Sequence, residues 1–287
     1  MLRRLARALT AAPLALVLAA LASWQLPAGG HHAATFQWRD DDPRFGGFSG
    51  LRLSEDGRSF TAITDKGNWL TGTIRRDGPH ITDITATPLS PLRNQKGQPV
   101  AVDESDSEGL ELAPDGTAFV SFEQHIGIRR YADLDGPAVQ MPNKPFARIA
   151  FNAGLEAVAL DGADLITIPE TPRDGAFNVW RLTDDWRRDF QIPARGIFRV
   201  ADADVFEGHL YILERAFLGI AFSSRVRRFD MQGGNEVTLL TSRPGKFDNL
   251  EGLSVWRDGG DTVLTMISDD NFMPFERTEI VEYRFPD

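Results

Sequence analysis

The sequence has 287 residues, of which 42% are hydrophobic and 25% are charged, a composition typical of a folded globular protein rather than a disordered or fibrous one. Acidic residues outnumber basic ones by 41 to 31, and this net charge of −10 argues against a broad electrostatic interaction with nucleic acid. The absence of cysteine excludes disulfides, thiol nucleophiles, iron–sulfur clusters and cysteine-based zinc sites.

The N-terminus has the three parts of a secretory signal peptide. Three arginines and no acidic residue precede an apolar run that extends from Leu14 to Ala22 and ends in small residues. The run is shorter than the roughly 20 residues that a membrane span needs. We therefore predict a signal peptide at 1–22 and a linker at 23–35, with an uncleaved N-terminal anchor as the alternative. Cleavage would leave 28 basic and 41 acidic residues, a net charge of −13, on a periplasmic or secreted protein.

A repeat of about 48 residues extends through the rest of the chain. Five segments align on the anchor residues Gly50, Gly109, Ala157, Val205 and Gly252. The first spacing is longer because of a Pro-, Gly- and Gln-rich insertion near 88–102. Each anchor starts a short alternating apolar run, followed by a tight turn, a second β-rich run and a third one. This order of alternating runs and tight turns indicates antiparallel strands joined by hairpins.

Repeats of about 40–50 residues, built from four antiparallel strands, are typical of a β-propeller. We predict an all-β fold: a propeller of five blades over residues 36–287, with six blades as the alternative. A strand near 35–38 is expected to join the last blade and close the ring, because an open ring would leave exposed strand edges. A β-sandwich is the rival fold, but it does not predict a regular period. No helix of more than two turns is expected.

The repeat predicts where acidic side chains gather. If the first strand of each blade lines the propeller channel, one mouth of the channel is surrounded by Ser49, Glu108, Glu156, Asp204 and Glu251. The residues that end the second strands are expected just outside them: Asp65, Glu123, Glu170, Glu214 and Asp269. Nine of these ten positions are acidic. Such a concentration of charge requires protonation, pairing with a nearby Arg52, Lys66, Arg215 or Arg277, or a bound cation.

Calcium is the cation that this oxygen-rich set favours, since Ca²⁺ prefers carboxylate and amide oxygens in flexible sites. We expect Ca²⁺ to be held by some of Glu108, Glu156, Asp204 and Glu251, with Asn249 adding a neutral oxygen. The alternative is that the acids cap loops by accepting backbone N–H bonds.

Four segments carry a family resemblance: 106–110, 212–217, 247–253 and 267–272. In this order they resemble the phytase-like domain, also called "esterase-like activity of phytase", over roughly 45–285. The residues that match the family pattern are Glu108, Glu214, Arg215, Asn249, Glu251, Asp269, Asp270 and Asn271. The third repeat departs from the pattern, with Ala157 where others have glycine. The resemblance implies a secreted or periplasmic propeller with phytase-type or esterase-type hydrolysis.

Metal-assisted hydrolysis is the chemistry that these residues favour. Calcium would polarise a phosphoryl or carbonyl oxygen, and Glu214 or Asp269 would act as the base. His125 is the one plausible histidine base, because it follows Glu123 on the acidic face. The side chains expected to bind substrate are Arg215, Lys66 and Asn271.

Three functions are consistent with the sequence. The first is a calcium-dependent hydrolase of a small phosphate or carboxylic ester, the second a lactonase-like hydrolase, and the third a non-catalytic, calcium-stabilised binding module. We expect a monomer with no nucleic-acid partner and no stable membrane span after signal cleavage.

Overall fold

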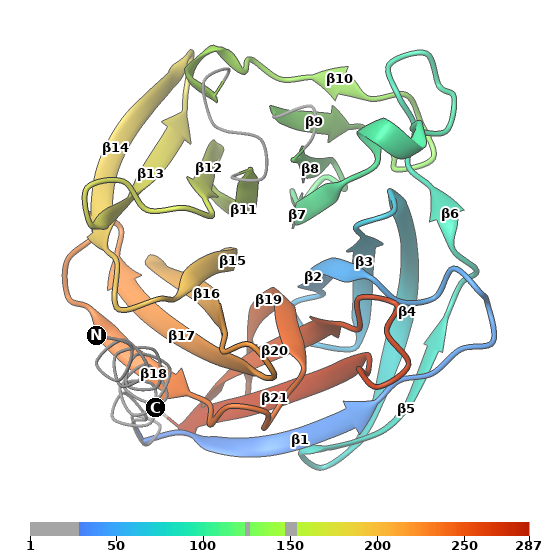
Figure 1. The fold of residues 1–287 in the computed structure, drawn as a ribbon, viewed down its shortest axis with the longest axis vertical. Helices are drawn as coiled ribbons and strands as arrows, with labels where there is room; N and C mark the ends of the chain where they lie inside the picture. The colour runs from blue at the N-terminus through green and yellow to red at the C-terminus, as the bar shows by residue number, and fades with distance from the viewer. Residues whose placement is uncertain (1–28, 124–126, 147–153, 287) are drawn as a thin grey trace, which may run out of the picture.

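Five four-stranded antiparallel sheets surround a central axis in the computed structural model, which describes residues 29–123, 127–146 and 154–286 (Figure 1). Blade 1 contains β2 (Phe48–Leu53), β3 (Ser59–Thr64), β4 (Asn68–Asp77) and β5 (His80–Ala86), with β6 (Ser90–Pro91) added beside β4. Blade 2 contains β7 (Ser107–Leu112), β8 (Ala118–Phe122), β9 (Gly127–Tyr131) and β10 (Val139–Gln140). Blade 3 contains β11 (Leu155–Asp161), β12 (Asp164–Pro169), β13 (Ala176–Leu182) and β14 (Trp186–Pro193).

Blade 4 contains β15 (Arg199–Phe206), β16 (His209–Phe217), β17 (Phe222–Asp230) and β18 (Val237–Thr241). Blade 5 contains β19 (Asn249–Asp258), β20 (Asp261–Asp269), β21 (Glu279–Pro286) and β1 (His31–Gln37). The inner strands β2, β7, β11, β15 and β19 contact one another around the axis (Figure 1). The predicted five-bladed, all-β propeller is therefore confirmed. In the described ranges the helices are two short 3-10 turns, η1 (Val102–Glu104) and η2 (Lys144–Phe146).

The ring closes between the two ends of the chain. Strand β1 pairs antiparallel with β21, with Thr35 opposite Val281, so the predicted closure is confirmed. The strand begins at His31, so the last residues of the segment 23–35, which the sequence predicted to be a linker, belong to the closing strand. The expected signal peptide lies outside the described residues. Within them, no helix has the length and apolar character needed to cross a bilayer.

Apolar residues of alternating strand positions fill the spaces between blades. Leu51, Phe60 and Ile74 of blade 1, for example, pack with Ile267 and Ile280 of blade 5. Because these side chains project from the same sheet faces, the period-2 pattern of the sequence becomes a core between neighbouring blades.

A β-bulge interrupts every inner strand close to its start. The register shifts fall between Phe48 and Gly50, Ser107 and Leu110, Leu155 and Ala157, Val200 and Asp202, and Leu250 and Gly252. A bulge leaves an extra residue unpaired and re-aims its side chain. The bulge holds Ser49, Glu108, Glu156 and Glu251 in four blades, as the sequence predicted for the inner ring. Blade 4 has Ala201 there, so the placement of Asp204 in this ring is wrong.

The anchor glycines of the repeat have a steric role where inner strands converge. A Cβ atom on Gly109 would lie 2.4 Å from the backbone oxygen of Glu156 in the next blade. We expect Gly109→Ala to lower the free energy of unfolding by about 1–3 kcal/mol, because the strands must separate to admit a methyl group. Thermal unfolding followed by circular dichroism measures this effect. Gly260→Ala is the matched control, since a Cβ atom there has no neighbour within 4 Å; equal stability of the two variants would contradict the steric argument.

Arg52 connects all five inner strands at the axis. Its guanidinium donates to the backbone oxygens of Leu253 (2.6 Å), Ala203 (2.7 Å) and Val158 (2.8 Å), and pairs with Asp202 (3.0 Å) and Glu111 (3.2 Å). The side chain is buried, and although burial alone would lower its pKa, the adjacent carboxylates raise it. The sequence offered Arg52 as a possible partner of the mouth acids, and this is wrong. Arg52 instead bonds to the inner strands of the other four blades and stabilises the ring at its axis.

Candidate functional site

The acidic mouth lies at the end of the propeller where the inner strands begin and the second strands finish. Antiparallel pairing brings these strand ends together in every blade, as in Asn249 opposite Asp269. We use this name for eight carboxylates: Asp65, Asp106, Glu108, Glu123, Glu156, Glu170, Glu251 and Asp269. Their mutual repulsion contributes to the raised pKa values of Glu108, Glu123 and Asp269 described below. The predicted concentration of acids at this end is therefore present.

The tightest group of acids comes from blade 2. One carboxylate oxygen from each of Asp106, Glu108 and Glu123 lies within 4.8 Å of the other two. Asp106 immediately precedes β7, Glu108 lies at its bulge and Glu123 follows β8. Burial raises the pKa of Glu108 well above its usual value, and the negative charges of Glu156 and Glu251 raise it further. Burial and Asp106 likewise raise the pKa of Glu123.

A second group comes from blade 5 and is more deeply buried. Asn249 Nδ2 donates to Glu251 Oε1 at 2.6 Å, while Asn249 Oδ1 accepts no hydrogen bond from any described residue, although the side chain is 2% exposed. Asp269 accepts a hydrogen bond from the backbone nitrogen of Asn271 at 2.6 Å. Burial raises the pKa of Asp269 to about 8, with Glu251 the next largest cause. Burial also raises the pKa of Glu251.

This donor set fits a hard cation. It consists of carboxylate oxygens and one amide oxygen, the ligand types that Ca²⁺ prefers. The unpaired amide oxygen of Asn249 is an independent indication, because a buried acceptor without a partner is costly. The acidic mouth therefore has the donor atoms that a metal ion needs.

Blade 4 contributes a cation where the other blades contribute an acid. Glu214 pairs with Val200, so Arg215 occupies the position that Asp65 and Asp269 have in their blades. Arg215 lies 3.2 Å from Glu251 and 3.8 Å from Glu170, with 25% of its side chain exposed. The expected position of Arg215 among the mouth acids is thus found.

Lys66 and Asn271 lie at the rim of the mouth. Lys66 Nζ donates to Asp65 Oδ2 at 2.7 Å and lies 5.4 Å from the centre of the Phe272 ring. The Asn271 side chain is exposed and donates to Glu276 at 2.7 Å. Both side chains are accessible from solvent, and their expected role in binding substrate stays a prediction.

Two predicted site residues lie elsewhere. Asp204 pairs with Tyr211 near the opposite end of β15 and accepts a hydrogen bond from the nitrogen of Val255 at 2.7 Å. Glu214 is fully buried and pairs with Arg225 (2.7 Å) and Arg227 (2.6 Å) inside blade 4. Asp204 as a mouth ligand and Glu214 as a base facing the mouth are therefore wrong. His125 lies outside the described residues.

The sequence did not predict Asp106 as a mouth acid, and it gave Asp270 no role beyond its match to the family pattern. Asp106 joins the blade 2 group, and its one signal is its position two residues before an anchor acid. Asp270 ties the β20–β21 loop to blade 1: it accepts from the nitrogens of Gly47 and Phe272, each at 3.1 Å, and from the Thr278 hydroxyl at 3.1 Å. Such a contact between distant segments has no local sequence signal.

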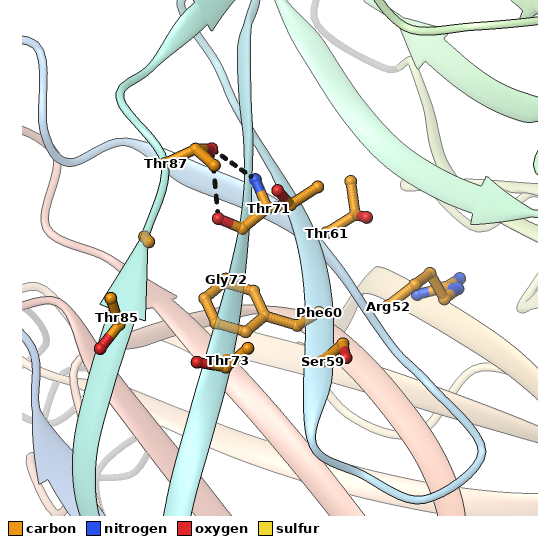
Figure 2. A pocket seen from close by; sticks show the side chains of 10 residues that line it. Arg52, Ser59, Phe60, Thr61, Thr71, Gly72, Thr73, Thr85 and Thr87 are labelled. Atoms are coloured by element: carbon orange, nitrogen blue, oxygen red, sulfur yellow. Dashed lines mark hydrogen bonds between the residues drawn. The ribbon is translucent and has the colours of Figure 1, made fainter.

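A pocket on blade 1 lies away from the acids. It has a volume of about 490 Å³ and is lined mainly by threonines of β3, β4 and β5 (Figure 2). Thr87 and Thr71 hydrogen-bond to each other there, at 3.1 and 3.2 Å. The only charged side chain that lines this pocket is Arg52, which is already engaged at the axis. The pocket therefore lacks the groups that hydrolysis needs.

The raised pKa values predict how pH affects the metal-free protein. A carboxyl whose pKa is higher in the folded state binds more protons there than in the unfolded chain, so stability falls as pH rises between the two values. Those values are about 4 unfolded and about 8 for folded Asp269. We expect the melting temperature without divalent cations to fall from pH 5 to pH 8. Thermal unfolding in chelator, with and without added calcium, measures this; a melting temperature that rises with pH in chelator would contradict it.

Comparison with known proteins identifies the family. The model of the phytase-like family, described as "esterase-like activity of phytase", matches residues 43–272. The chain belongs to the phytase-like family. No curated protein matches the sequence of this phytase-like chain.

Solved structures share the fold of the phytase-like chain at low sequence identity. The catalytic domain of a GH62 α-L-arabinofuranosidase from Coprinopsis cinerea is 13% identical, with a TM-score of 0.54, covering 91% of this chain and 98% of its own. A putative exo-β-1,3-galactanase from Bifidobacterium bifidum is 12% identical, with a TM-score of 0.50, covering 86% and 91%. At these identities the likeness concerns the fold alone.

Proposed function

We propose that this phytase-like chain is an exported, calcium-dependent hydrolase that cleaves a phosphate or carboxylic ester at the acidic mouth. The observation that carries this proposal is the convergence of eight carboxylates, three of them with oxygens within 4.8 Å of one another, on a face with two accessible cations. Membership of the phytase-like family supports hydrolysis. The signal-peptide pattern of residues 1–22 supports export.

Asp106, Glu108 and Glu123 would hold the calcium, with Glu156, Glu251 and Asn249 completing the oxygen-rich surroundings. When bound, calcium supplies positive charge that polarises a phosphoryl or carbonyl oxygen. It also removes the obstacle to an anionic ester, which eight uncompensated carboxylates would repel.

The residues around the metal site have separate roles in this proposal. Asp269 is the general base, because its carboxylate is held by the Asn271 nitrogen at one edge of the mouth and its raised pKa lies near neutrality. Arg215 and Lys66 bind the negative end of the substrate, since both keep part of their side chain exposed. Asn271, at the rim of the mouth, orients the rest of the substrate.

Two other functions have support from particular observations. Arg215 and Lys66 are both already paired with acids, which favours a neutral ester or lactone over a phosphate. The nearly complete burial of Asn249 and Glu251 on β19 favours a structural cation in a non-catalytic binding module.

The deciding experiment is an assay of the purified protein with calcium against p-nitrophenyl phosphate, phytate, short acyl esters and lactones. Activity that chelator removes, calcium restores and Asp269→Asn abolishes without unfolding the protein supports the hydrolase. Calcium binding with no turnover of any substrate identifies the binding module. Absence of both calcium binding and turnover refutes the proposal.

A further inference from the structure

Exposed hydrophobic side chains gather at the same end as the acids. Among the described residues, seven large apolar side chains at this end are markedly exposed: Val102, Ile197, Phe217, Ile220, Phe272, Met273 and Phe275. Val102 lies in the 3-10 turn η1, and the other six lie in loops or at a strand end, all at the side where the inner strands begin. One further exposed residue of this kind, Val139, lies on the outer strand β10. Three of the seven, Phe272, Met273 and Phe275, come from one loop, and an apolar group of this kind beside charged residues is a candidate binding surface.

The β20–β21 loop presents the part of this surface nearest to the acids. Phe272, Met273 and Phe275 are 42%, 43% and 70% exposed. Asn271 and Phe272 both have positive φ, at 48° and 52°, a conformation that is costly for side-chain-bearing residues and collects at functional sites. The loop therefore holds its apolar residues outward although hydrophobicity alone would bury them.

Phe272 is in direct contact with the margin of the acidic mouth. A Cβ atom on Gly47 would lie 2.7 Å from the Phe272 ring and 2.2 Å from Asp65 Oδ1, so the ring and the carboxylate both pack on this glycine. Lys66 pairs with Asp65 and lies 5.4 Å from the centre of the same ring. The Phe272 ring, the Lys66 ammonium group and the Asp65 carboxylate therefore lie next to one another at the margin of the acidic mouth.

We propose that the ligand of the acidic mouth is an amphiphile: an ester with a hydrocarbon chain that lies on Phe272, Met273 and Phe275 while its polar head occupies the mouth. This inference rests on the proposed function and names the substrate class for it. The occupant is a single dispersed molecule rather than a bilayer, because a ring of acids at the centre of the surface opposes an anionic membrane. The hydrocarbon chain of the ligand adds affinity because it removes the exposed apolar side chains of this loop from water.

The test uses methyl-, butyl- and hexylphosphonate as non-hydrolysable probes, measured by calorimetry with the full protein in calcium and in chelator. We expect affinity to rise about two- to four-fold per methylene, as burial of hydrocarbon predicts. Phe275→Ser should weaken hexylphosphonate about five- to ten-fold and leave methylphosphonate unchanged. Val139→Ser, at a comparably exposed site on β10, is the matched control and should change neither.

The outcomes separate this inference from the function on which it rests. Calcium-dependent binding that is independent of chain length overturns the amphiphile and leaves the hydrolase intact. Chain-length dependence without calcium dependence supports the apolar surface and counts against the cation site. Binding to phosphatidylcholine vesicles that Phe275→Ser abolishes, with no chain-length effect in solution, overturns the inference in favour of a membrane surface.

Discussion

Replacing Arg52 with methionine is expected to lower the free energy of unfolding by about 3–5 kcal/mol, because it leaves Asp202 and Glu111 as uncompensated buried charges. Three backbone oxygens, from Leu253, Ala203 and Val158, also lose a donor. For a domain of this size the melting temperature should fall by on the order of 10 °C. Denaturant titration and thermal unfolding measure the change.

Arg75→Met is the matched control for Arg52→Met. Arg75 pairs with Asp83 on the surface, where its side chain is 76% exposed, and such pairs contribute about 0–1 kcal/mol. Adding Asp202→Asn to Arg52→Met should recover part of the loss, since it removes one of the unpaired charges. If Arg52→Met is as stable as the control, the guanidinium does not fasten the blades.

Glu108→Gln is expected to weaken calcium binding by on the order of 100-fold or more, because it removes one of the three convergent carboxylates. The metal-free variant should be at least as stable as the parent protein near neutral pH. Burial and neighbouring charges disfavour the ionised form of Glu108, as its raised pKa indicates, and glutamine removes that penalty. Calorimetric titration and melting with and without calcium measure both effects.

Glu55→Gln provides the control for Glu108→Gln, since it removes the same charge from an exposed turn at the opposite end of the propeller. Loss of binding in both variants would indicate a long-range effect of net charge rather than a site. Unchanged affinity in Glu108→Gln would exclude the blade 2 group as the calcium ligands.

Arg52→Met is expected to destabilise the metal-free protein and Glu108→Gln is not, because charges are balanced around Arg52 and unbalanced at the acidic mouth. Around Arg52, carboxylates and guanidinium are paired, so removing one partner destabilises the protein. At the acidic mouth the carboxylates exceed the cations, and removing one relieves repulsion while reducing affinity for a cation. In the proposed function, the repulsion that lowers the stability of the metal-free protein at the acidic mouth is relieved when a cation binds.

Strand positions followed closely from the sequence. The second β-rich run predicted after each anchor is a strand in every blade, as in β3 (Ser59–Thr64) and β8 (Ala118–Phe122), because period-2 alternation and tight turns are local properties. The repeat also identified the anchor glycines, and the structure gives the reason for Gly109: no side chain fits where its inner strand meets the inner strand of the next blade. Blade number, ring closure and the acidic end all depend on this period.

Blade 4 shows where the repeat was insufficient. Its anchor was taken as Val205, but the residue equivalent to Gly252 in pairing is Asp202. The equivalent residues Ala157, Asp202 and Gly252 are separated by 45 and then 50 residues, so a constant spacing of about 48 residues misassigns the register of blade 4 by three positions. That shift assigned Asp204 to the position that Ala201 occupies, and the end of the second strand was placed at Glu214, one residue before Arg215.

The sequence by itself determined the five blades, the closing strand and the end at which acids collect, since these depend on strand periodicity and turn chemistry within each repeat. Only the tertiary structure decided which charges meet. Arg52 pairs across the axis with residues 59 and 150 positions away, and Arg215 enters the acidic mouth through a register that bulges set. Side-chain pairing depends on the distance between atoms from different blades, and that distance is fixed only when the ring closes.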